Sequence, residues 1–288
     1  MSTGIEYLDK AWNLTAGCSP AGPGCTHCYA ARFARRIAAN PAMRGLVELA
    51  RDGNAQRPDG IVIPDNAGPW SPRWTGKVRT FPDRLEVPKH WRKPRAIGVC
   101  FMSDLFHQGV PDDFILAAIR VMAACPQHAF VVLTKRPKRM QGIMLPPPHG
   151  GAWPLPNAYL GASASTQADV DAAAPHLAKL AGAGWKTWLS LEPLLAPVDL
   201  DIDIGQGVGD LLSDRLAGVV VGAETGPGAR PCKAEWIESV VAQCEAAGVP
   251  MFVKAAPPRS GVGPEDDHMR LDHWVPRPWP RELAWRKG

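Results

Sequence analysis

Short apolar segments alternate with stretches of helical periodicity from residue 96 to residue 254. Within each apolar segment, few polar residues interrupt the apolar ones, which is typical of strands buried on both faces of a parallel sheet. The stretches between them carry apolar residues three and four positions apart, which indicates helices. The predicted strands are Ala96–Met102, Ala129–Thr134, Ala158–Ala162, Thr187–Leu191, Gly218–Gly222 and Pro250–Lys254, and the predicted helices are Pro111–Ala124, Arg136–Ile143, Thr166–Ala181 and Lys233–Ala247.

The same pattern begins near the N-terminus, with a strand predicted over Ala11–Ala16 and a helix over Tyr29–Ala39. Seven strands, most of them followed by a helix, predict an α/β fold: a (βα) barrel or partial TIM barrel with parallel strands. A doubly wound sheet is the alternative, but no GxGxxG motif follows the first strand. We expect one barrel-like domain over residues 1–254, with a Pro/Trp-rich insertion at 51–95 and an irregular C-terminal tail at 255–288.

Polar side chains follow the predicted strands. In a parallel barrel the loops after the strands converge at one face, so these side chains predict a lined pocket. The alternative is that polar residues simply resume where strands end. The strand-end residues are Cys18, Ser103, Asp104, Thr134, Lys135, Arg136, Ser163, Ser165, Ser190, Glu192, Glu224, Thr225 and Lys254.

The composition is that of a folded protein, with 45% hydrophobic and 21% charged residues among 288. These values exclude a disordered or collagen-like chain. No apolar run approaches the roughly 18–20 residues of a membrane span. The first ten residues include acids and lack the apolar core of a secretory signal. We expect a cytoplasmic protein with no membrane partner.

Three of the seven cysteines form a C-x6-C-x2-C pattern at Cys18, Cys25 and Cys28. An odd count and this clustering indicate a metal site in a reducing compartment rather than a disulfide framework. Structural zinc normally takes four protein ligands, with His27 and Cys100 as candidates for the fourth. Three thiolates instead suit a [4Fe–4S] cluster with one open iron. An iron–sulfur cluster, zinc and unligated thiols all stay open at this point.

The chain is basic in its first third, where residues 1–95 hold 15 Lys and Arg against 8 Asp and Glu, whereas the remainder holds 17 against 20. Trp side chains among these cations suit a nucleic-acid groove, because rings stack on bases while cations neutralise phosphates. The alternative is a lid whose Trp and Pro residues pack over the barrel. The candidate contacts to a substrate, DNA or RNA are Trp70, Arg73, Trp74, Lys77, Arg79, Arg230 and Lys254.

Motifs occur along most of the chain: GCTHCYA (24–30), RWTGKVRTFPDRLEVPKHWRKPRAI (73–97), MSDLFHQGVPDDF (102–114), LTKRPKRM (133–140), LPNAYLGAS (155–163), LSLEPLL (189–195), VVVGAETGPGARP (219–231) and GVPMFVK (248–254). Together they resemble a family of phage-encoded and bacterial proteins with a three-cysteine motif, which is distantly similar to radical S-adenosylmethionine (SAM) enzymes. The resemblance covers about residues 11–254. It implies the host cytoplasm as the location if the chain is phage-encoded.

The resemblance implies a [4Fe–4S] cluster on the three cysteines and SAM bound at its open iron. Reductive cleavage of SAM would release a 5′-deoxyadenosyl radical, with an electron donor such as flavodoxin or ferredoxin as partner. Ser103 and Asp104 lie where this fold usually binds the SAM amino group. The implied cofactor-binding residues are Ser103, Asp104, Lys135, Ser163, Glu192 and Glu224.

We therefore expect a radical SAM-like iron–sulfur enzyme that modifies or repairs a substrate, with a nucleic-acid base as one candidate. One alternative is a zinc-bearing nucleic-acid-binding protein without catalysis. Another is a protein whose Fe–S cluster is structural or sensing. A metal-free barrel hydrolase using Glu192 and Glu224 is a further alternative.

Overall fold

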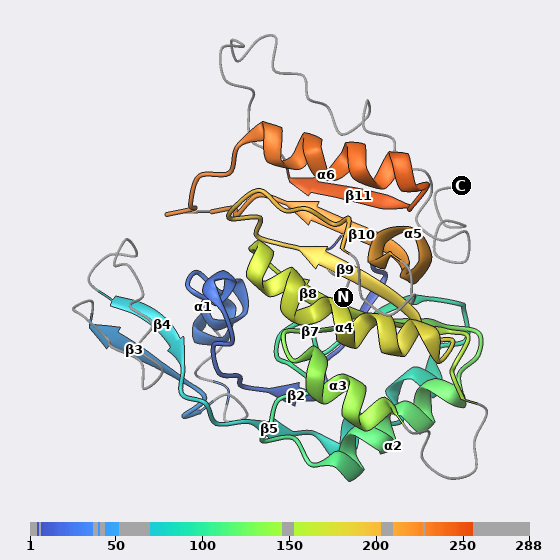
Figure 1. The fold of residues 1–288 in the computed structure, drawn as a ribbon. Helices are drawn as coiled ribbons and strands as arrows, with labels where there is room; N and C mark the ends of the chain where they lie inside the picture. The colour runs from blue at the N-terminus through green and yellow to red at the C-terminus, as the bar shows by residue number, and fades with distance from the viewer. Residues whose placement is uncertain are drawn as a thin grey trace.

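A seven-stranded parallel sheet, curled into a half-barrel, forms the centre of the chain (Figure 1). The computed structural model describes residues 5, 7–36, 40, 44–51, 70–145, 153–202, 210–226 and 228–255. Strand order follows chain order throughout the sheet, which confirms the partial barrel and differs from a doubly wound sheet, whose order reverses. Across the sheet the strands are β1 (Lys10–Trp12), β6 (Ala96–Val99), β7 (Ala129–Thr134), β8 (Ala158–Ala164), β9 (Lys186–Leu191), β10 (Leu216–Gly222) and β11 (Met251–Ala255).

The helices lie close to their predicted ranges. Thr166 and Asp169 form a reciprocal capping box at the start of α4, and Gly248 ends α6 with a φ of 69° that suits glycine. No helix in the described part of the chain is both long and apolar enough to cross a membrane. The helices are α1 (Tyr29–Arg36), α2 (Asp112–Ala123), α3 (Pro137–Met144), α4 (Gln167–Gly182), α5 (Leu211–Arg215) and α6 (Ala234–Ala247). Residues 37–39, where α1 was predicted to continue, lie outside the described residues.

The two faces of the sheet have separate cores. One face packs against the helices through a large cluster that includes Val132, Ile115 and Ile237. The other face carries Trp188, which is 1% exposed and whose Nε1 donates to the Val132 carbonyl oxygen at 3.1 Å. A Cβ on Gly161 would lie 2.2 Å from this indole ring, so the glycine provides the space that Trp188 fills.

The predicted strand Ala11–Ala16 divides into β1 and β2 (Thr15–Ala16), which belong to different sheets. β1 pairs with β6, whereas β2 pairs antiparallel with β5 (Arg79–Thr80). Between them, the Asn13 carbonyl accepts from Arg84 and the Leu14 carbonyl accepts from the Phe81 amide. These hydrogen bonds to the insertion take the chain out of the main sheet.

β6 also ends earlier than predicted, at Val99 rather than Met102. Cys100 has a φ of 57°, in the left-handed region that a β-strand excludes, so the chain turns after Val99. The turn directs the following residues toward the carboxyl ends of the neighbouring strands.

The insertion folds beside α1 (Figure 1). β3 (Val47–Arg51) and β4 (Trp70–Trp74) form an antiparallel pair. The first of these strands therefore begins before residue 51, where the insertion was predicted to start. Short 3-10 turns follow over Pro82–Arg84 and Val87–His90. Residues 52–69 within the insertion and 256–288 of the predicted tail lie outside the described residues.

Candidate functional site

A cavity of about 240 Å³ opens at the carboxyl ends of the parallel strands. This is the position that the polar strand ends predicted, since the loops of a parallel barrel converge there. The lining therefore brings together residues as far apart in the sequence as Ile5 and Lys254. The predicted site and strand-end residues that line it are Cys18, Cys25, Cys28, Trp74, Ser103, Asp104, Thr134, Lys135, Arg136, Ser163, Ser190, Glu192, Glu224, Thr225 and Lys254.

The three cysteines reach the cavity from one loop. A 3-10 turn over Pro23–Cys25 shapes it, and the Cys28 amide then donates to the Cys25 carbonyl just ahead of α1. The Ala21 amide donates to Cys25 Sγ at 3.5 Å. Main-chain N–H groups aimed at sulfur stabilise thiolate charge, as they do around Fe–S clusters.

The donor set fits a metal centre in its chemistry, because three half-buried thiols line the same cavity. Among the described residues, no three His, Cys, Asp or Glu side chains already have their donor atoms close enough to enclose an ion. Burial, and then the neighbouring Asp104 carboxylate, raise the pKa of Cys18 to about 12. A bound cation would favour the deprotonated ligand.

Gly24 allows the cysteine loop to approach the ends of β7 and β8. A Cβ at this position would lie 2.2 Å from Ser165 Oγ and 3.4 Å from Lys135 Nζ. Ser165 is 1% exposed, and its hydroxyl has no hydrogen-bond partner within the described structure. The loop therefore lies directly against the sheet at Gly24, where a larger residue does not fit.

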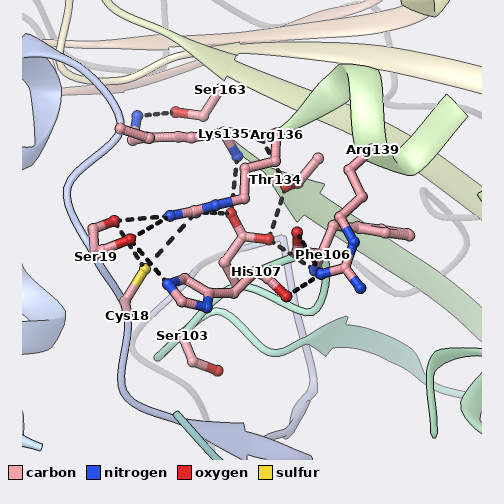
Figure 2. A network of polar contacts seen from close by, with 12 residues as sticks. Cys18, Ser19, Ser103, Phe106, His107, Thr134, Lys135, Arg136, Arg139 and Ser163 are labelled. Atoms are coloured by element: carbon pink, nitrogen blue, oxygen red, sulfur yellow. Dashed lines mark hydrogen bonds and ion pairs between the residues drawn. The ribbon is translucent and has the colours of Figure 1, made fainter. Parts of the chain in front are cut away.

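Arg136 belongs to the polar network shown in Figure 2, and it pairs with Asp104. Asp104 accepts from the Thr134 hydroxyl and the Phe106 amide through Oδ1, and from the Lys135 amide and Arg136 NH1 through Oδ2. The Arg136–Asp104 contact is 2.7 Å, and the Asp104 side chain is 6% exposed. Protein donors thus surround the carboxylate that was expected to bind the SAM amino group.

Arg136 connects this network to the cysteine loop. Its NH2 group donates to the carbonyl oxygen and to the hydroxyl of Ser19, each at 2.9 Å. Its NH1 group lies 3.9 Å from Cys18 Sγ (Figure 2). Arg136 therefore places a positive charge beside one of the three thiols.

His107 supports the same part of the loop. Its Nδ1 accepts from the Gly109 amide at 3.0 Å, so the neutral ring carries its proton on Nε2 and donates to Ser19 Oγ at 2.8 Å. Burial, and then the positive charge of Arg136, lower the pKa of His107 to about 4. The imidazole is neutral near pH 7.

Glu224 is likewise surrounded by hydrogen-bond donors. Its Oε2 accepts from the Arg230 amide at 2.8 Å, from Arg230 Nε at 2.9 Å and from His27 Nδ1 at 3.0 Å, while Oε1 accepts from Arg230 NH2 at 2.5 Å. Burial raises the pKa of Glu224, but the hydrogen bonds from Arg230 and His27 outweigh it and bring the pKa to about 2. His27, a candidate zinc ligand, is bonded to Glu224 here.

The remaining polar groups in the cavity have fewer hydrogen-bond and ion-pair partners. Lys135 Nζ donates to Ser163 Oγ at 2.6 Å, and no carboxylate lies within 4 Å of it among the described residues. Glu192 pairs with Lys254 at 3.2 Å and accepts a long contact of 3.5 Å from the Ser190 hydroxyl.

The side chains of Ser103 and Cys100 are directed toward β2. The Ser103 hydroxyl lies 2.5 Å from Thr15 Oγ1 and donates to the Thr15 carbonyl at 2.9 Å. Cys100 is fully buried, and burial raises its pKa. Cys100 is fully buried, whereas the three thiols of the loop are half-buried at the cavity. This difference does not favour Cys100 as a fourth ligand.

Trp74 and Trp91 of the insertion pack against other side chains. Trp74 is 8% exposed and packs on alanines of α1 while also lining the cavity. Trp91 packs against the main core and edge-on to His128, with 6.2 Å between ring centroids. Both contacts agree with the lid interpretation.

The insertion cations that were predicted to contact a substrate do not line the cavity. Lys77 and Arg79 are exposed and Arg73 is half-buried, and none of the three is among the described residues that line the cavity. Arg230 binds Glu224 instead of a ligand. Trp70 belongs to β4, and its side chain lies outside the described part of the chain.

Several cavity residues were not singled out from the sequence. Tyr7 and Tyr29 line the cavity, and Tyr29 OH donates to the Phe101 carbonyl at 2.5 Å. Ser19, which also lines the cavity, was missed, as was His107, which does not line it but bonds to Ser19. His107 follows Asp104 by three positions within the MSDLFH segment, which was the one available signal.

Comparison with solved structures finds a partial overlap of fold. A double mutant of spore photoproduct lyase, with bound AdoMet and dinucleoside spore photoproduct, is 14% identical with a TM-score of 0.45, over 83% of this chain and 62% of that one. Spore photoproduct lyase complexed with dinucleoside spore photoproduct is 14% identical with a TM-score of 0.44, over 85% and 63%. The chain thus spans less than two thirds of these proteins, and at this overlap the likeness does not bear on its chemistry.

Comparison with curated proteins finds no match. A family model described as "Protein of unknown function (DUF5131)" matches residues 2–258. This range contains the cysteine loop, the insertion and all seven strands of the sheet. The chain therefore belongs to the DUF5131 family.

Proposed function

We propose that this protein is a radical SAM-like iron–sulfur enzyme whose [4Fe–4S] cluster is held by Cys18, Cys25 and Cys28. One observation carries the proposal: three thiols from a single loop line the same cavity as the polar ends of the parallel strands. A cluster with three cysteine ligands supplies, when bound, an electron and one open iron position for SAM. The motif resemblance to radical SAM enzymes supports the same assignment.

The cavity residues supply binding and orientation in this proposal. Lys135, with Ser163 beside it, suits a carboxylate, because its ammonium group has no acidic partner among the described residues. Glu192 suits a hydroxyl or an amino group, since Lys254 occupies one of its oxygens. Arg136 lies next to Cys18 and offsets the negative charge of a thiolate there.

The proposed reaction modifies or repairs a substrate, and a nucleic-acid base is the substrate class that we favour. The exposed Lys77 and Arg79 support a polyanionic partner near the cavity. Flavodoxin or ferredoxin is the proposed electron donor. Membership in the phage-related three-cysteine group stays a prediction.

Reductive cleavage of SAM tests the proposal directly. Anaerobic protein with reconstituted cluster is incubated with dithionite and SAM, and 5′-deoxyadenosine and methionine are measured by chromatography. We expect both products from the wild type and neither from Cys25→Ala. Iron-loaded wild-type protein that binds SAM without cleaving it would contradict the enzymatic assignment and favour a sensing role.

A further inference from the structure

We infer that the charged residues around the cavity have two separate roles. Asp104, Arg136, Glu224 and Arg230 are positioning residues that fix the cysteine loop before any metal binds, whereas Lys135 and Glu192 face the bound ligand. The inference about the loop stands on the metal-free chain alone. The inference about the ligand rests on the proposed function and narrows its binding site.

The two positioning carboxylates have no acceptor capacity left for a ligand. A carboxylate accepts about four hydrogen bonds. Asp104 already accepts four, two on each oxygen, from Thr134, Phe106, Lys135 and Arg136. A ligand amino group would have to displace one of these donors, and the side chain is 6% exposed.

Glu224 is equally occupied. It accepts three hydrogen bonds from Arg230 and one from His27, and its side chain is 7% exposed. The Arg230 contact is bidentate, which fixes the plane of the guanidinium group. The function of each carboxylate is therefore to orient one arginine.

Each oriented arginine then binds the main chain of the cysteine loop. Arg136 donates to the Ser19 carbonyl, next to Cys18, and Arg230 donates to the Pro23 carbonyl at 2.8 Å, two residues before Cys25. A guanidinium has five N–H donors in a rigid fork, so it binds carboxylate and loop at once. The loop is thus held at two points, from the end of β7 and from the end of β10.

Lys135 and Glu192 differ from this pattern because neither contacts the cysteine loop main chain through a hydrogen bond that the structure describes. Lys135 Nζ uses one of its three donors, on Ser163. Glu192 has one close partner, Lys254, whose side chain is 39% exposed. A cation and an anion with spare capacity in one cavity suit a zwitterionic ligand, such as an amino-acid moiety.

Hydrogen–deuterium exchange on the metal-free protein tests the loop role. We expect Arg230→Gln and Arg136→Gln to raise the exchange rate of the amides in residues 18–28 at least 10-fold, with little change in Tm. The matched controls Lys135→Gln and Glu192→Gln should leave loop exchange within 2-fold of wild type. Unchanged exchange in Arg230→Gln, which is more exposed than Arg136 and less disruptive to replace, would overturn the loop role by itself.

Equilibrium binding of SAM to protein with reconstituted cluster tests the ligand role. Lys135→Gln and Glu192→Gln should each raise the Kd for SAM at least 10-fold at full iron content. Arg230→Gln molecules that retain a cluster should bind SAM with a Kd within 3-fold of wild type. If Glu224 and Arg230 bound SAM directly, the Kd would rise by more than this. If wild-type protein binds no SAM, the ligand role falls with the proposed function, while the exchange result still decides the loop role.

Discussion

The three cysteines of the loop differ from Cys100 in exposure. Cys18, Cys25 and Cys28 are half-buried around one cavity, whereas Cys100 is fully buried behind β2. We expect Cys25→Ala to abolish iron binding and Cys100→Ala to leave iron content within about 20% of wild type. Iron and sulfide analysis of anaerobically purified variants measures this, and equal loss in both variants would make Cys100 a fourth ligand.

His107 predicts a pH dependence of stability in the metal-free chain. Its pKa is about 4 in the fold, below its ordinary value of 6.5, because burial and Arg136 disfavour the charged ring. As pH falls from 6.5 toward 4, the unfolded chain takes up a proton that the folded chain refuses, so the free energy of unfolding decreases. Chemical denaturation at several pH values should show a shallower decrease in His107→Gln, and parallel curves would contradict this assignment.

The sequence predicted the types and positions of the site residues better than their roles. Asp104 and Glu224 were identified from their places after β6 and β10, and both do line the cavity. The donors that bind these carboxylates could not be predicted. Arg136 lies 32 positions away from Asp104, and a backbone turn brings Arg230 back onto Glu224. A single sequence does not show which carboxylate an arginine will bind.

At the scale of elements, the approach of the cysteine loop to β7 and β8 depends on Gly24. We expect Gly24→Ala to reduce iron content several-fold, because the added Cβ would lie 2.2 Å from Ser165 Oγ and push the loop outward. Adding Ser165→Ala, which removes that oxygen, should restore part of the iron content. Metal analysis and Tm together measure the effect.

Gly142 is the matched control. It lies exposed within α3, and a Cβ there would meet nothing within 4 Å. Gly142→Ala should raise the free energy of unfolding by about 0.5–1 kcal/mol through helix propensity and leave iron content unchanged. Full iron content in Gly24→Ala as well would contradict the steric role of Gly24.

Strands were predictable where burial alone determines them. The range Ala129–Thr134 was predicted as observed, since both faces of β7 are covered. The range Ala11–Ala16 was wrong as one strand, because hydrogen bonds from Phe81 and Arg84 draw Asn13 and Leu14 away from the sheet. Those donors lie in a Pro-rich insertion whose position no local pattern indicates.

At the scale of the whole molecule, Trp188 is a large buried side chain in the core on the inner face of the half-barrel. Trp188 fills the space above Gly161 and hydrogen-bonds across to β7. We expect Trp188→Ala to lower the free energy of unfolding by about 3–5 kcal/mol, the usual range for a buried aromatic residue. Denaturant titration followed by circular dichroism measures this, and a loss below about 1 kcal/mol would show that the inner face is not a tightly packed core.

The alternation of strands and helices was sufficient to predict the partial barrel and the edge at which its polar residues meet. The chemistry at that edge depends on whether the three thiols hold one cluster. The most direct measurement is iron and sulfide content with EPR spectra of anaerobically purified, reduced protein, with and without SAM. We predict about four irons per chain and an EPR signal that changes when SAM is added. Colourless protein with one zinc per chain, or an iron signal indifferent to SAM, would contradict the radical SAM assignment.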